Sequence, residues 1–167
     1  MNIKDIYSEL IKRKIEGIMF HEQAMEIMLF FGFDKLYEKQ SERFISESSE
    51  LCEINEFLVK QHNLIVRINE PSDQKLIPSM WYDYTRFDIS NNTKQTFMKE
   101  FFEKWYEWEK ETRDIFLRMS KEAFNEGEII DFIKINKMAK CTNKEVEKVQ
   151  EMILKFKSMD FSISCYY

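Results

Sequence analysis

Turn-forming residues are scarce in this chain of 167 residues. It contains three glycines and two prolines, whereas proteins built from β-sheets need such residues at many turns. Long apolar runs are also missing, because no stretch of the sequence approaches the roughly 18 apolar residues of a membrane-spanning helix. These absences predict an all-α fold made of a few long helices, and they argue against a membrane protein.

Cysteine is equally sparse. Cys52, Cys141 and Cys165 lie far apart in the sequence, no two of them have the spacing of a metal site, and an odd number cannot form a closed set of intramolecular disulfides. The first residues also lack the apolar core of a secretory signal peptide. We therefore expect free thiols and a cytoplasmic location.

The charge balance is mildly acidic, with a net charge of −5. A nucleic-acid-binding protein needs a basic face that displaces counterions from the phosphates, so nucleic acid is a disfavoured partner. An acidic protein can instead bind a basic groove on another protein. The hydrophobic share of 44% is that of a globular domain with a sizeable core.

Apolar residues recur at steps of three and four along four stretches of the chain, as they do on the buried face of a helix. The predicted helices cover about 3–31, 34–60, 93–125 and 128–157. Gly32 directly follows the first stretch and Gly127 lies two residues past the third, where a glycine commonly ends a helix in the left-handed conformation. The first and second helices, and the third and fourth, should therefore form two tight hairpins.

A long connection, residues 61–92, joins the two hairpins. A loop of that length is uncommon unless it has a structural or functional role. A connection that runs along the whole bundle is such a role, and it would make the second and third helices parallel. The predicted architecture is a four-helix bundle over 1–160 with short, long and short connections, followed by an aromatic tail, 161–167. Candidate interaction residues lie in the crossover and the tail: Trp81, Tyr82, Tyr84, Tyr166 and Tyr167. The tail aromatics have two alternatives, since they could dock on the bundle or on a partner.

The chain resembles the ferritin-like superfamily over about residues 6–156, and two segments carry the resemblance. They are GFDKLYEKQSERFISESSEL after the first turn and YEWEKETRDIF in the third helix. The resemblance implies that Glu109 occupies a metal-ligating position. The aromatic crossover and the tail DFSISCYY are also similar to small ferritin-like proteins of unassigned function that phages and prophages encode.

The di-iron centre of that family takes a Glu from each of two helices and a Glu-x-x-His motif from each of the other two. Neither histidine of this chain completes the motif, because Ile18 precedes His21 by three residues and Val59 precedes His62 by three. This departure argues against an oxidase and favours a non-catalytic protein.

Carboxylates nevertheless fall on the apolar lines. Glu109 and Glu145 both lie 18 residues from Gly127, so they should meet at the same depth. Glu47 lies 15 residues from Gly32. If residues at a similar distance from Gly32 meet, the partner of Glu47 on the first helix is Glu16. If residues on the apolar lines meet, the partner is Glu22, and both alternatives stay open.

Two functional hypotheses follow. In the first, the bundle has no cofactor and acts through protein contacts, with a partner or a second copy, as a phage accessory or host-interaction protein. In the alternative, a carboxylate cluster binds Fe or Mn; its candidate ligands are Glu16, His21, Glu22, Glu47, Glu50, Glu109 and Glu145. A structural role competes with the metal site. In that role, these carboxylates pair with Arg43, Arg113 or Lys148.

Overall fold

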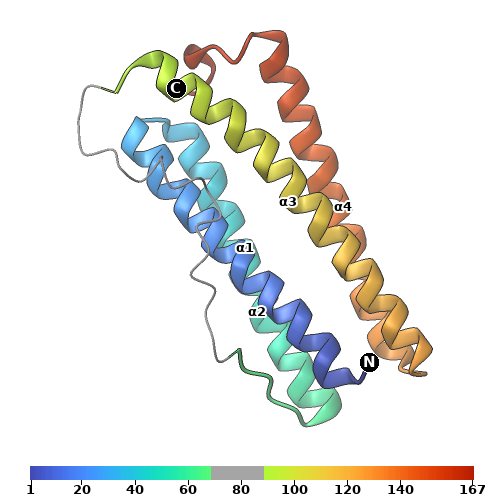
Figure 1. The fold of residues 1–167 in the computed structure, drawn as a ribbon. Helices are drawn as coiled ribbons and strands as arrows, with labels where there is room; N and C mark the ends of the chain where they lie inside the picture. The colour runs from blue at the N-terminus through green and yellow to red at the C-terminus, as the bar shows by residue number, and fades with distance from the viewer. Residues whose placement is uncertain (69–88) are drawn as a thin grey trace.

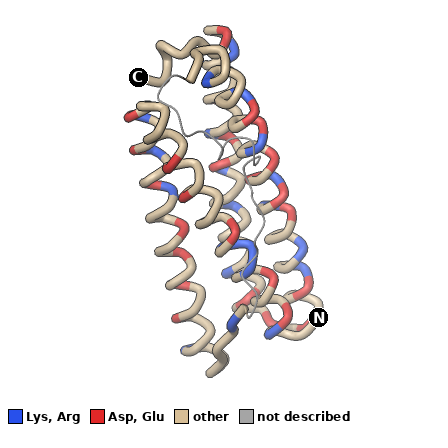
Figure 2. Tube along the Cα trace, turned by 60° about the vertical axis from the view of Figure 1, so that its left-hand side comes forward, with Lys and Arg blue, Asp and Glu red and all other residues tan. Residues whose placement is uncertain are grey.

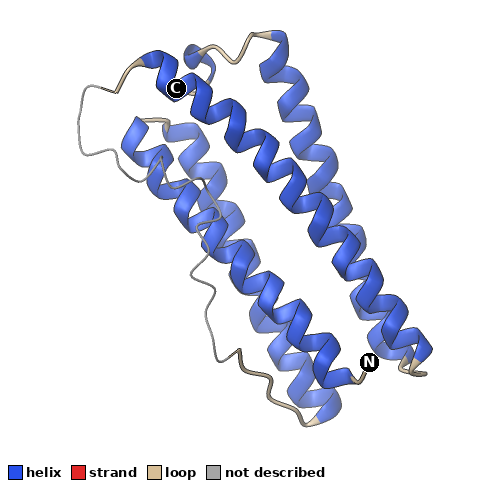
Figure 3. Cartoon of the chain, in the orientation of Figure 1, coloured by secondary structure: helices blue, strands red, loops and turns tan. Residues whose placement is uncertain are grey.

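The computed structural model describes residues 1–68 and 89–167. It contains four long helices, α1 (Ile3–Phe31), α2 (Asp34–His62), α3 (Asn91–Asn125) and α4 (Ile129–Ser158), and a short 3₁₀ turn, η2 (Ile163–Cys165) (Figure 1). No strand occurs in the described ranges (Figure 3). The prediction of an all-α chain with four long helices is therefore confirmed. None of the described helices has both the length and the apolar character that crossing a bilayer requires.

The helix ends follow local chemistry. Gly32 adopts φ 76° and donates its amide to the last carbonyls of α1, and Gly127 adopts φ 79° between α3 and α4. The second helix extends two residues beyond its predicted end, to His62, and stops where Asn63 turns left-handed at φ 49°. The third begins two residues early because the Ser90 side chain accepts the N–H of Thr93 at its first turn.

The four helices form two hairpins that pack on each other mainly through α1 and α3, while α2 and α4 approach each other less closely. Figure 1 shows α2 ending at the opposite end of the molecule from the start of α3, so these two helices run in the same direction. Most of the predicted crossover, including Trp81, Tyr82 and Tyr84, lies outside the described residues.

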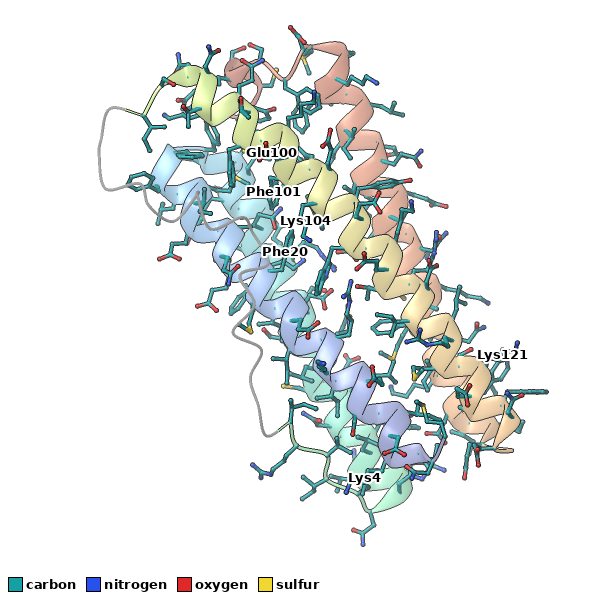
Figure 4. The ribbon with its side chains drawn as sticks, viewed as in Figure 1. Lys4, Phe20, Glu100, Phe101, Lys104 and Lys121 are labelled. Atoms are coloured by element: carbon teal, nitrogen blue, oxygen red, sulfur yellow. The ribbon has the colours of Figure 1, made fainter. Side chains whose placement is uncertain are left out.

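The core has two parts. An aromatic part fills the end near Gly32, and an aliphatic part fills the end near Gly127. Phe20 of α1 and Phe101 of α3 point toward one another between the two hairpins (Figure 4), with nearly parallel rings 5.7 Å apart. Contacts of this kind hold the hairpins together, because aromatic pairs gain energy beyond the apolar area that they bury.

The buried face of α1 differs from the apolar line that periodicity predicts. That line passes through Glu22 and Leu29, yet both side chains are exposed. The buried positions instead form a heptad pattern that includes Lys14, Gly17 and His21. The prediction for Glu22 was wrong because it followed the most apolar residues. Lys14 and His21 are buried instead, because polar side chains of α2 contact them in the core.

The carboxy-terminal tail folds back onto the bundle. The Tyr166 side chain is fully buried, and its ring lies 5.1 Å from that of Phe156 and 5.2 Å from that of Phe33. Tyr167 is 52% exposed while its ring still contacts Phe33. Of the two alternatives open for the tail, Tyr166 adopts the intramolecular one.

We expect Tyr166→Ala to lower the free energy of unfolding by about 3 kcal/mol or more, because it empties a buried aromatic site. Urea denaturation followed by circular dichroism measures this. Tyr167→Ala is the matched control and should cost much less. Tyr166→Phe should cost little, since the buried hydroxyl has no hydrogen-bond partner in the described part of the chain. Equal losses for Tyr166→Ala and Tyr167→Ala would contradict the docked tail.

Candidate functional site: a charge cluster inside the bundle

Between the two parts of the core lies a cluster of charged side chains from all four helices. Its centre is Arg43 on α2, which forms an ion pair with Glu47 one turn further along the same helix. The Arg43 guanidinium also lies 3.7 Å from a Glu109 oxygen on α3 and 3.7 Å from a Glu145 oxygen on α4. One cation thus bridges carboxylates from three helices, and the predicted meeting of Glu109 and Glu145 occurs around it.

Lys14 of α1 supplies the second cation and is only 3% exposed. Its ammonium donates to Glu47 at 2.9 Å and forms a further ion pair with Glu50. Burial alone would lower the pKa of Lys14, but Glu47 and Glu50 outweigh that effect, so the pKa is raised. Lys14 therefore stays charged, and Glu47 is held between Lys14 and Arg43.

His21 and Glu109 face each other across the cluster, with 3.9 Å between the His21 Nε2 and a Glu109 oxygen. Burial, together with the nearby Arg43, lowers the pKa of His21 to about 3. The neutral ring is oriented by Gln40, whose side-chain oxygen lies 2.7 Å from Nδ1. His21 is thus an uncharged, positioned imidazole at neutral pH.

Glu109 is almost completely buried, at 3% exposure. Its pKa is raised to about 7, mainly by burial and also by Glu47 and Glu145, although Arg43 and the Trp105 indole N–H lower it. The indole N–H donates to Glu109 at 3.1 Å. Glu109 therefore gains or loses a proton near neutral pH, unlike an ordinary surface carboxylate.

A cation–aromatic contact flanks the cluster. The Arg13 guanidinium lies over the Trp108 ring at 3.4 Å from its centroid and donates to the Thr112 hydroxyl at 2.8 Å. Glu16 lies 4.0 Å from Arg13 and belongs to this flank. On α1, the side chain that contacts Glu47 is that of Lys14. Neither Glu16 nor the exposed Glu22 is therefore the α1 partner of Glu47.

The candidate metal ligands therefore divide into two groups. Those that the structure brings together are His21, Glu47, Glu50, Glu109 and Glu145; those that it does not are Glu16 and Glu22. Within the described ranges, no group of three or more His, Cys, Asp or Glu side chains has an arrangement suited to a metal ion. The gathered carboxylates contact the nitrogens of Arg43 and Lys14, with Lys148 adding a 2.9 Å contact to Glu145.

The sequence reasoning missed a second buried polar cluster, at the end of the bundle near Gly127. The Asp131 side chain is fully buried; one of its oxygens accepts from the Tyr7 hydroxyl at 2.6 Å and lies 2.8 Å from the His62 Nε2. Asp131 sits in the first turn of α4, so its sequence position is that of an ordinary acidic residue at a helix start. Its apolar sequence neighbours give no signal of this burial, because Ile129 and Ile130 are themselves exposed.

Comparison of this chain with protein-family models, with curated proteins and with solved structures finds no match. The function must therefore be argued from the geometry of the chain itself.

We expect Arg43→Met to lower the free energy of unfolding by about 3 kcal/mol or more, because it leaves buried carboxylates without their shared cation. Thermal and urea unfolding measure the effect. Lys39→Met, one turn earlier on α2 and exposed, removes the same charge from the same helix and should change stability by less than about 0.5 kcal/mol. Similar costs for the two variants would show that the cluster contributes no special stability.

The raised pKa of Glu109 makes a pH-dependent contribution with a definite sign. Between the unfolded-state pKa of 4.5 and the folded-state pKa of about 7, the folded chain binds a proton that the unfolded chain releases, so this contribution to stability is lost as pH rises. Relative to the wild type, Glu109→Gln should therefore gain stability between about pH 4 and pH 8, by on the order of 3 kcal/mol.

Urea denaturation of both proteins across this pH range measures that difference. The low pKa of His21 acts in the opposite direction, giving stability that is present above pH 6.5 and lost as pH falls toward about 3. Because His21 is present in both proteins, its contribution cancels in the comparison. A pH-independent difference between the two would show that Glu109 titrates as an ordinary carboxylate.

Proposed function

We propose that this chain is a non-catalytic helical bundle that acts by binding another protein. The observation that carries the proposal is the pairing of the gathered carboxylates with Arg43 and Lys14. A cluster that compensates its own charges in this way is a structural element of the core. The chemistry of binding then lies on the surface.

One surface supports this role. Four large apolar side chains at the tip of the α3–α4 hairpin are between 49% and 59% exposed; they are Phe124, Ile129, Ile130 and Ile133. Exposed apolar clusters of this kind mark interaction sites. Glu122 and Glu126 lie beside them on the final turn of α3 and its cap. A complementary partner presents an apolar pocket with a basic rim.

The proposal includes a ferritin-like arrangement of the helices. Its support is the shared direction of α2 and α3 in Figure 1, which requires a connection that spans the length of the bundle. A role as a phage accessory or host-interaction protein is the biological form of the proposal. It rests on the resemblance of the crossover and the tail to phage-encoded proteins.

A carboxylate metal site remains the alternative function, because Glu47, Glu109 and Glu145 converge from three helices on one point. Binding Fe or Mn there would require the Arg43 guanidinium to move away. The carboxylates would then ligate the metal in the position that the guanidinium now occupies.

We expect Ile133→Glu to weaken binding of the partner by at least about tenfold, since a charge in the centre of an apolar contact must be desolvated. The partner is identified by cross-linking in cells that express the chain and is then titrated with purified protein. Leu154→Glu makes the same change at an exposed site near the other end of α4 and should bind normally. A partner that binds Ile133→Glu as tightly as the wild type would exclude the hairpin tip.

A further inference from the structure

A groove runs along the face of the bundle between α2 and α4. It consists of two adjoining hollows of about 650 Å³ and about 570 Å³ that share Glu42 and Ser46 on their α2 side. The groove exists because α2 and α4 approach each other less closely than the helices of either hairpin do. It is distinct from the hairpin tip discussed above.

The two rims carry opposite charge in the hollow nearer to Gly127, whereas both signs occur on each rim of the other hollow. On α2, Glu42, Glu50 and Glu53 line the hollow nearer to Gly127, and on α4 Lys134 and Lys137 line the same hollow. Figure 2 colours the acidic and basic residues of the described chain along its trace.

These charges do not close the groove within one molecule. In the described part of the chain, α2 and α4 are joined by the ion pair of Arg43 with Glu145 and by the contact of His62 with Asp131, while Lys134 lies over the Phe57 ring at 4.7 Å. Glu53 and Lys137 are both exposed. Between the rims lie apolar groups, including Ile45, which is 62% exposed, and Met138.

We propose that the α2–α4 groove binds the same groove of a second copy of this chain. Two copies can face each other about a twofold axis parallel to the helices, which places α2 of each copy over α4 of the other at the same height. In the hollow nearer to Gly127, acidic α2 then meets basic α4 twice, and Ile45 is covered. A twofold axis across the helices would place acidic α2 on acidic α2, so the charges select the first arrangement.

The helix directions and the area agree with this dimer. Figure 1 shows α2 and α4 running in opposite directions, so α2 of one copy packs antiparallel to α4 of the other, which is favourable for their dipoles. Two helices side by side over about 30 Å present roughly 600 Å² in each copy. The total of roughly 1,200 Å² reaches the lower end of specific interfaces.

Charge reversal tests the proposal, since Glu53 and Lys137 lie at the same height in the groove. Analytical ultracentrifugation should show a concentration-dependent dimer of the wild type. Glu53→Lys and Lys137→Glu should each weaken it by at least about tenfold. An equimolar mixture of the two variants should restore it, because each new charge then meets its opposite on the other chain. Circular dichroism confirms that both variants are folded.

A disulfide test maps the axis of the dimer. Ser49 and Cys141 line opposite rims of one hollow, so Ser49→Cys in a Cys52→Ser background should form a disulfide with the partner's Cys141 under mild oxidation. A cross-link between two copies of Ser49→Cys would instead indicate the other axis and overturn the arrangement.

Three further results would overturn the proposal: a wild type that stays monomeric at high micromolar concentration, a dimer that both single variants preserve, or a mixture that fails to restore it. A wild type that stays monomeric because a different protein occupies its groove would also overturn the proposal. Ile133→Glu should leave the dimer intact, so loss of the hairpin-tip partner and loss of the dimer are separate outcomes.

Discussion

The ion pairs of Arg43 constrain the rest of the structure. Its guanidinium lies inside a helical bundle, where an unpaired charge is very costly, and it meets carboxylates on its own helix, on α3 and on α4. Sliding or rotating any of these helices would separate charges that have little access to water. The cluster therefore favours one register of the two hairpins, a use of buried polar groups that is well attested in helical assemblies.

The same cluster explains the unusual chemistry of its neighbours. Arg43 and burial together keep His21 neutral, while burial keeps a proton on Glu109 up to near-neutral pH. A neutral histidine and a partly protonated glutamate reduce the net charge that must be buried. Aromatic packing lies on one side of the cluster and aliphatic packing on the other, while Arg43 and Glu145 keep some exposure where they line the α2–α4 groove.

Much of the fold was predictable from the sequence because helical periodicity and two glycines mark its long elements. Glu47, one of the carboxylates on the predicted apolar lines, is indeed buried. Counting from Gly127 correctly brought Glu109 and Glu145 to one place. That reasoning needs only the regular rise of a helix on each side of a tight turn.

The rest could not be predicted from apolar character alone. Lys14 looks like a surface residue in the sequence, and it is buried because Glu47 and Glu50 approach it from another helix. Asp131 is buried for a similar reason, since Tyr7 and His62 reach it from α1 and α2. Such residues enter a core only when distant partners are present, and a single sequence does not reveal those partners.

Charges of opposite sign also lie close together on the surface. The acidic rim of α2 and the basic rim of α4 lie on opposite sides of one groove, although the chain as a whole has a net charge of −5. The hairpin tip is different, because apolar side chains predominate there. Two chemically distinct surfaces on one bundle fit a protein that works through contacts.

The most direct test of the central claim is a crystal structure of the protein grown with Mn²⁺, with anomalous data collected for manganese. We expect the Arg43 guanidinium between Glu47, Glu109 and Glu145, with no anomalous peak among these carboxylates. An anomalous peak at that point, with Arg43 turned away, would show that the carboxylates bind metal. The cluster would then be a metal centre.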